Sequence, residues 1–174
     1  MGEMIIFDGI KVPIGSHERK TIVIGADHRG FEYKERIKEV FSKRNYQFID
    51  VGTFSLERCD YPIISNKIAK QVAKDFYNKV GIGICGSGIG ILIPASKHRS
   101  IYGARCLTPK EAETSRQHNN SNFLSIGADC VNLETAINTI DAWLTTSFYS
   151  DPEKEKSYLK RYVQTLKLEE RLLK

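Results

Sequence analysis

Short apolar runs alternate along most of the chain with longer stretches in which apolar residues recur every three or four positions. The short runs have the length and composition of buried strands; they are Thr21–Ala26, Tyr46–Val51, Val80–Ile84, Ile101–Cys106 and Asn122–Ile126. The longer stretches have the spacing of helices that bury one face; they are Phe31–Arg44, Pro62–Tyr77, a segment ending near His98, Pro109–Asn119, Leu133–Ser147 and Pro152–Leu173.

Prolines and a threonine mark the expected helix ends. Thr108 precedes Pro109 and has the side chain of a good N-cap residue. Pro62 and Pro152 suit the first turn of a helix, where the missing N–H costs nothing. Pro94 is expected to bend its helix or end it early.

The alternation of strands and helices predicts an α/β fold. Five repeats in one unit indicate a Rossmann-like, three-layer αβα arrangement around a five-stranded parallel sheet. We expect residues 20–150 to form this domain, with residues 1–19 as an extension of unassigned role. Residues 151–174 are the C-terminal helix of the same domain. Its apolar stripe is longer than one small domain needs, which favours packing on a partner subunit.

Four groups of polar and glycine residues follow or close predicted strands. Ligands of parallel sheets bind beyond the carboxyl ends of the strands. The groups are Asp27–His28, Cys85–Gly90, Arg105–Cys106 and Gly127–Asp129. We therefore expect all four along one edge of the sheet.

Composition narrows the function classes. The 174 residues are 41% hydrophobic and 27% charged, with a net charge of +5 and with acidic and basic residues interspersed. No long basic stripe favours nucleic-acid binding, whereas a mild positive balance suits a small anionic substrate. The four cysteines lack CxxC spacing, which indicates reduced thiols and a cytoplasmic protein. No apolar run reaches the ~18 residues of a membrane span, and no histidine spacing suggests a metal site.

The stretch Val80–Pro94 contains the most informative residues. A predicted strand ends at Cys85, and Gly86, Gly88 and Gly90 follow with a hydroxyl at Ser87. Glycines let successive backbone N–H groups approach an anion, and a cysteine at the entrance of such a loop lies in a field that favours its thiolate. The alternative is an inert buried thiol at a strand end.

Two other interpretations of this stretch are weaker. Gly81–Gly86 matches the dinucleotide pattern GxGxxG, but its glycines lie inside the predicted strand and no ribose-binding acid follows at the expected distance. A cysteine phosphatase needs an arginine six positions after its cysteine, where this chain has Ile91. Two further polar pairs, Asp27–His28 and His118–Asn119, could be helix caps or site residues.

Taken together, four motifs resemble the type B ribose-5-phosphate isomerases and the related galactose-6-phosphate isomerase subunits. The motifs are Gly25–Phe31, Asp60–Pro62, Ile84–Ile91 and Ser115–Asn122, in the same order and spacing over about residues 20–150. The Ser-Arg-Gln-His-Asn sequence that begins at Ser115 is the ribose-type form.

The resemblance implies an aldose–ketose isomerase that needs no metal or organic cofactor. It acts on a phosphorylated sugar through a cis-enediolate. Cys85 matches the family's base and His118 its ring-opening acid–base group, and the amides of Gly86, Gly88 and Gly90 with Ser87 match its anion hole. Asp27 matches the group that moves protons between O1 and O2, Asn119 the residue that orients the sugar, and His28 a position near the phosphate. A homodimer or tetramer with shared sites is also implied.

The phosphate end departs from the family pattern. Where the family has an arginine after the fifth strand, this chain has Asp129. Of the family's Arg-His-x-x-Arg segment, Arg161 matches the second arginine, and either Ser157 or Lys156 takes the place of the first. We therefore keep three hypotheses. The first is a ribose-5-phosphate isomerase whose phosphate contacts are rearranged to His28, Arg161 and either Arg29 or Lys156. The second is a same-family isomerase for an allose- or galactose-6-phosphate type of sugar, and the third is a non-catalytic sugar-phosphate-binding relative.

Overall fold

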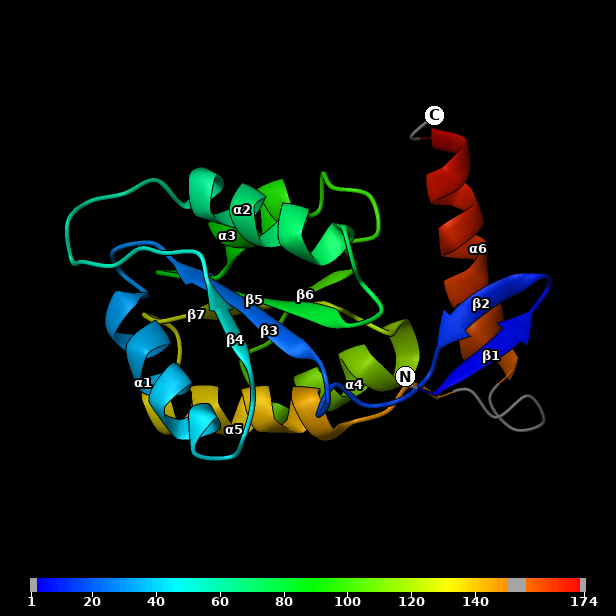
Figure 1. Ribbon diagram of the computed structural model, residues 1–174, viewed down its shortest axis with the longest axis horizontal. Helices are drawn as coiled ribbons and strands as arrows, with labels where there is room; N and C mark the ends of the chain where they lie inside the picture. Colours follow the sequence, from blue (N-terminus) through cyan, green and yellow to red (C-terminus); the bar gives the residue numbers. More distant parts are fainter. Residues whose placement is uncertain (1–2, 150–155, 173–174) are drawn as a thin grey trace.

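A five-stranded parallel sheet forms the centre of the protein in a computed structural model that describes residues 3–149 and 156–172 (Figure 1). The strands are β3 Thr21–Ala26, β4 Phe48–Asp50, β5 Lys79–Cys85, β6 Gly103–Arg105 and β7 Phe123–Gly127, in the order β4-β3-β5-β7-β6. The helices are α1 Phe31–Ser42, α2 Tyr61–Ala73, α3 Ile89–Ala95, α4 Pro109–Asn119, α5 Leu133–Thr145 and α6 Lys156–Leu172.

Helices cover both faces of the sheet, as the alternating pattern predicts. Residues of α1, α4 and α5 pack on one face around Trp143, and α2 and α3 pack on the other around Phe123. The three-layer α/β fold is therefore confirmed. None of the described helices is both long and apolar enough to cross a bilayer.

Element ends differ from the predictions where local signals compete. The predicted range of β3 is confirmed, and α4 begins at Thr108 with a capping box to Glu111. The edge strands β4 and β6 are shorter than predicted because each pairs with one neighbour only. Helix α3 ends at Ala95, directly after Pro94. The predicted helix start at Pro152 lies outside the described residues.

Helix α2 ends four residues earlier than the apolar spacing predicts. It ends at Ala73 instead of Tyr77. Asp75 and Asn78 form a turn there: the Asn78 backbone N–H and its side-chain amide both bond to Asp75, each at 2.9–3.1 Å. Side chains of this kind compete with the helix for hydrogen bonds and favour turns.

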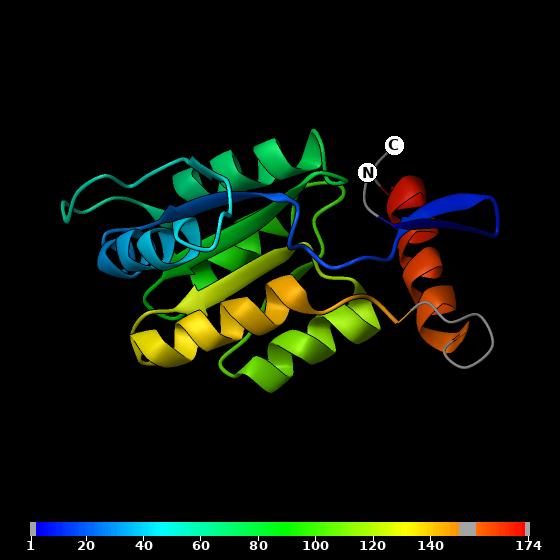
Figure 2. The same cartoon turned by 60° about the horizontal axis from the view of Figure 1, so that its bottom comes forward.

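Residues of the N-terminal extension form a hairpin that lies against α6, apart from the central sheet (Figure 2). Strands β1 Met4–Phe7 and β2 Ile10–Pro13 pair antiparallel and pack against α6. One face of α6 therefore already has a partner within its own chain. Its packing on a second subunit stays a prediction.

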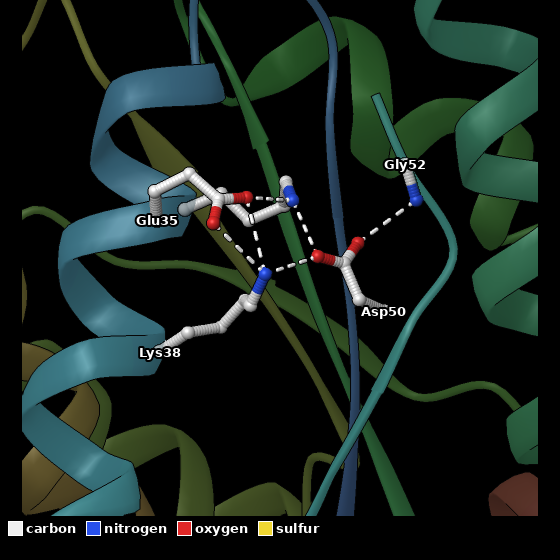
Figure 3. A network of polar contacts seen from close by, with 5 residues as sticks. Glu35, Lys38, Asp50 and Gly52 are labelled. Carbon is white, nitrogen blue, oxygen red and sulfur yellow. Dashed lines mark hydrogen bonds and ion pairs between the residues drawn. The ribbon is translucent and has the colours of Figure 1, made fainter. Parts of the chain in front are cut away.

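An ion-pair network ties the end of β4 to α1 (Figure 3). Asp50 Oδ2 accepts from Lys34 and Lys38, each at 2.5 Å, and its Oδ1 accepts from the Gly52 N–H at 2.9 Å. Glu35 accepts from the same two lysines. Burial alone would raise the pKa of Asp50, but the two lysines overcome this and lower it. The network fixes the start of the loop that leads to the site.

We expect Asp50 to stabilise the fold in a pH-dependent way. Its folded-state pKa lies below the ordinary 3.8, so the contribution is complete above about pH 5 and is lost as the pH falls below about 4. Asp50→Asn should lower the free energy of unfolding at pH 7 by about 1–3 kcal/mol. Urea unfolding between pH 3 and 7 measures both effects.

The matched control is Glu39→Gln, because Glu39 pairs with Arg36 and Lys43 at an exposed surface of α1. Exposed pairs of this kind contribute little, so the pH profile should barely move. An Asp50→Asn protein as stable as its parent at pH 7 would contradict the assigned role.

Candidate active site

The glycine loop after β5 directs backbone N–H groups toward a sulfur and a hydroxyl. Cys85 is the last residue of β5 and is 3% exposed. The Gly88 N–H donates to its Sγ at 3.2 Å, and the Ile89 N–H donates to Ser87 Oγ at 3.2 Å. A donor that points at the sulfur stabilises negative charge on it. The loop thus brings a backbone donor directly onto the Cys85 sulfur.

Two of the loop glycines are required by close neighbours. Gly88 has φ +75°, and a Cβ there would lie 2.9 Å from the Gly127 nitrogen. Its carbonyl accepts a hydrogen bond from Ser125 of β7, which anchors the loop to the sheet. A Cβ on Gly90 would lie 3.0 Å from the ring of Tyr61. The loop is thus held from both sides in one conformation.

Asp27 and His28 lie at the neighbouring strand end. Asp27 Oδ1 accepts from the N–H groups of Arg29 and Gly30 at 3.0 and 3.1 Å, so the carboxylate holds the turn before α1. Gly30 is the N-cap residue of α1, so Asp27 closes the turn before the helix and does not cap it, and this contact occupies one of the two carboxylate oxygens. His28 Nδ1 lies 3.3–3.4 Å from the backbone of Cys59, which fixes the ring against the loop after β4.

Arg29 and Asp129 form an ion pair over the start of the glycine loop. Arg29 donates to Asp129 Oδ2 through Nε at 2.8 Å and through Nη2 at 2.6 Å. Both side chains lie over Gly86, where a Cβ would come within 2.7 Å of Arg29 Nε and 2.5 Å of Asp129 Oδ2. Asp129 therefore does not leave a bare negative charge at this edge.

The four predicted groups meet at one edge, as their strand ends indicate. Ala26 is in register with Ile84, and Cys85 with Gly127. At the edge strand, Arg105 Nε donates to the Ser87 carbonyl at 2.7 Å. Arg105 was placed at this edge by its position at a strand end, but its contact with the loop was not predicted.

His118 and Asn119 lie at the opposite end of the sheet. Helix α4 begins beyond the carboxyl end of β6 and ends before the amino end of β7, where the Asn122 N–H bonds to the Tyr102 carbonyl. The residues form a cavity of ≈ 250 Å³ together with Arg161 and Tyr162 of α6. Between Phe123 and Gly127 the sheet rises roughly 13 Å. Within one chain, His118 and Cys85 are therefore in two separate groups.

Arg116 anchors the helix end that carries His118. It is fully buried and donates to the carbonyls of Gly15, Ser121 and Thr146 and to Asn120 Oδ1. Burial lowers its pKa to about 9. No pattern along the chain predicts this arrangement, because two of the four acceptors, the Gly15 and Thr146 carbonyls, are far from Arg116 in sequence.

Neither a wider groove nor a metal cluster offers another site. A groove of ≈ 750 Å³ runs between the hairpin and the Tyr77–Asn78 turn, but its lining contains no histidine, cysteine or aspartate. Among the residues the structure describes, no three His, Cys, Asp or Glu side chains gather as metal ligands. The loop edge and the His118 cavity remain the candidate halves of a site.

Comparison with known proteins identifies the family. The sequence profile of the Ribose/Galactose Isomerase family matches residues 22–160. This chain belongs to that isomerase family. Ribose-5-phosphate isomerase B of Escherichia coli K12 is 42% identical over 129 residues, which are 74% of this chain and 86% of the relative. The resemblance inferred from the four motifs is confirmed.

Solved structures of the isomerase family agree with the fold. Ribose-5-phosphate isomerase B of Clostridium thermocellum superposes with a TM-score of 0.80 at 35% identity, covering 87% of this chain and 98% of that one. The Mycoplasma genitalium enzyme, solved with bound ribulose-5-phosphate, also gives a TM-score of 0.80, at 27% identity, covering 86% and 96%.

Proposed function

We propose that this chain interconverts ribose 5-phosphate and ribulose 5-phosphate. The observation that carries the proposal is Cys85 at the mouth of the glycine loop, with the Gly88 N–H donating to its sulfur. The similar protein of Escherichia coli is a ribose-5-phosphate isomerase B, which supports ribose 5-phosphate as the substrate of this chain. The Mycoplasma genitalium relative was solved with bound ribulose-5-phosphate, which supports this ketose as the product.

The reaction moves a proton between C1 and C2 of the opened sugar. We assign His118 to ring opening and Cys85 to removal of the C2 proton. The enediolate that forms carries charge on an oxygen, which the N–H groups of the Gly86–Gly90 loop and the Ser87 hydroxyl stabilise. Asp27, with one oxygen free of the α1 turn, moves protons between O1 and O2, and Asn119 orients the sugar. A carbon acid this weak needs both the base and the anion hole.

We place the sugar's phosphate near His28 and Arg29 of the loop edge and near Arg161, which lines the His118 cavity and would reach the site from the second copy of the homodimer proposed below. The Arg29–Asp129 ion pair supplies a guanidinium that lies over Gly86 although the family's arginine is missing after β7. Asp129 then orients Arg29 and does not face the phosphate directly. Lys156 and Ser157 are both exposed at the start of α6, so neither alignment of that segment is favoured.

Arg29→Met should raise the KM for ribose 5-phosphate about 10-fold with a small change in kcat, because a charged hydrogen bond to the phosphate is lost. Steady-state kinetics measures the split. Asp129→Asn keeps the guanidinium and should change KM less. The charge swap, Arg29→Asp with Asp129→Arg, returns an arginine to the end of β7 and should recover much of the lost affinity. An unchanged KM in Arg29→Met would place the phosphate elsewhere.

We propose a homodimer in which each site combines the loop edge of one copy with the His118 cavity of the other. The two groups lie at opposite ends of one sheet, so one chain cannot bring them to the same sugar. Exposed apolar side chains beside the loop, Ile63, Ile89 and Ile93, suit a contact between copies. We expect these dimers to pair further into tetramers, as the family resemblance implies.

Asp129 favours one alternative, an isomerase of the same family for an allose- or galactose-6-phosphate type of sugar. The test is an assay of purified protein with ribose-, allose- and galactose-type phosphates, with exchange of the C2 proton followed in parallel. We expect turnover and exchange with ribose 5-phosphate. Turnover with another sugar alone would support the alternative, and no exchange with any sugar would indicate a binding protein without catalysis.

A further inference from the structure

His118 lies face to face with a tyrosine ring. The ring centroids of His118 and Tyr158 are 4.2 Å apart, and their planes differ by only 8°. Tyr149 adds a third ring, 5.9 Å from His118 and 6.0 Å from Tyr158. To the rest of the described chain, the imidazole nitrogens of His118 make no hydrogen bond. The tyrosine stack is therefore the contact that sets the plane of the imidazole.

Helix α6 and the N-terminal hairpin hold Tyr158 in place. The next residue, Leu159, is fully buried, as is Val12 of the hairpin, in one apolar cluster with Val163. Lys167 pairs with Asp8 at the hairpin turn. The family match begins at residue 22, so the hairpin belongs to the part of this chain outside it.

The hairpin segment also reaches the helix that carries His118. Asn120 caps α4 in a left-handed conformation, and its Nδ2 donates to the Pro13 carbonyl at 2.7 Å. Arg116 Nη2 donates to the Gly15 carbonyl at 3.1 Å. Both partners of the stack, on α4 and on α6, are thus fixed to the same N-terminal segment.

We propose that Tyr158, held by α6 on the N-terminal hairpin, is a positioning residue that orients the His118 imidazole for ring opening. The inference rests on the proposed function. In that step His118 gives a proton to ring oxygen O4 as the C1–O4 bond breaks, and the O1 hydroxyl gives its proton to the Asp27 carboxylate as the C1–O1 double bond forms. Rotation of the imidazole about its Cβ–Cγ bond would turn its N–H away from O4, and the flat stack removes that freedom.

The two substrates allow ring opening to be separated from proton transfer at carbon. Ribose 5-phosphate is a closed furanose and must be opened. Ribulose 5-phosphate cannot form a five-membered ring, because its O5 bears the phosphate. Exchange of deuterium from water into C1 of ribulose 5-phosphate therefore needs the base and the anion hole but no ring opening.

The test compares Tyr158→Leu with Tyr158→Phe in the full-length protein. Tyr158→Leu should slow conversion of ribose 5-phosphate about 10-fold, with exchange into ribulose 5-phosphate within about twofold of the parent. Tyr158→Phe keeps the ring and should keep both rates. Val12→Ala, distant from the sugar, should give a weaker defect of the same kind. Equal losses in both assays, or no loss in Tyr158→Leu, would overturn the inference.

NMR of the His118 ring protons tests the stack with Tyr158 independently of catalysis, so it separates this inference from the proposed function. A stacked ring shifts the His118 ring protons upfield, and Tyr158→Leu should return them toward the position of an unstacked histidine, whether or not the protein turns over sugar. A parent protein with the upfield shift but no isomerisation would overturn the proposed function and leave the stack. A parent without the shift would overturn the stack and leave the function.

Discussion

Cys85→Ala is expected to lower kcat for ribose 5-phosphate by about 10³-fold, within the range that general bases contribute. The loss should appear in kcat more than in KM, because the thiol acts on the C2 proton and not on the phosphate. Exchange of the C2 proton with solvent should stop as well. Steady-state kinetics together with NMR detection of exchange measures both effects.

The matched control is Cys106→Ala, which removes another buried thiol next to the same sheet. Burial raises the pKa of Cys106 to about 11, so this thiol stays protonated and has no catalytic use. Its loss should cost some stability, about 1 kcal/mol, but little activity. Normal turnover by folded Cys85→Ala would show that another group is the base.

The loop half of the site was predictable because local sequence determines it. A strand that ends in Cys85 and continues in glycines at every second position predicts a backbone-lined anion site without any distant residue. The same holds for β3, where an apolar run gives both ends, and for α4, where Thr108 and Glu111 form the capping box. Parallel strands then bring Asp27 to the same edge.

What the sequence did not predict depends on contacts between distant positions. Arg29 and Asp129 are 100 residues apart, and only the register of the sheet brings them together over Gly86. The hairpin was left unassigned because four-residue strands carry a weak periodic signal. Its contribution to the fold is the burial of Val12 against the apolar face of α6, a contact that only the structure shows.

The position of His118 depends both on a local motif and on the arrangement of distant elements. Its motif identified the residue, but the motif by itself does not show that α4 carries it to the far end of the sheet from Cys85. The helix runs antiparallel to its strands, so a residue at its last turn must lie at their amino ends. Two copies in a symmetric pair can bring such opposite ends together.

Mixing two inactive variants should therefore restore activity. Cys85→Ala lacks the base, and His118→Ala lacks the ring-opening group, so each alone should convert ribose 5-phosphate very slowly. In a mixed dimer, one site receives both substitutions and the other receives neither. Random exchange makes half of the dimers mixed, each with one intact site of two, so activity should rise to about a quarter of the parent's.

The controls decide whether the gain comes from shared sites. Each variant is first taken through the same dissociation and reassociation alone, which should give no gain. A chain that carries both substitutions, mixed with the parent, leaves no intact site in a mixed dimer with shared sites, because each site then receives one substitution. Only the quarter of dimers made of two parent chains stays active, so activity should be about a quarter of the parent's, whereas sites within one chain would give about half. A different result would show that each site belongs to one chain: the two single variants stay inactive after exchange, and the control with both substitutions gives about half of the parent's activity. His118 would then have to reach Cys85 of its own chain by a rearrangement of α4.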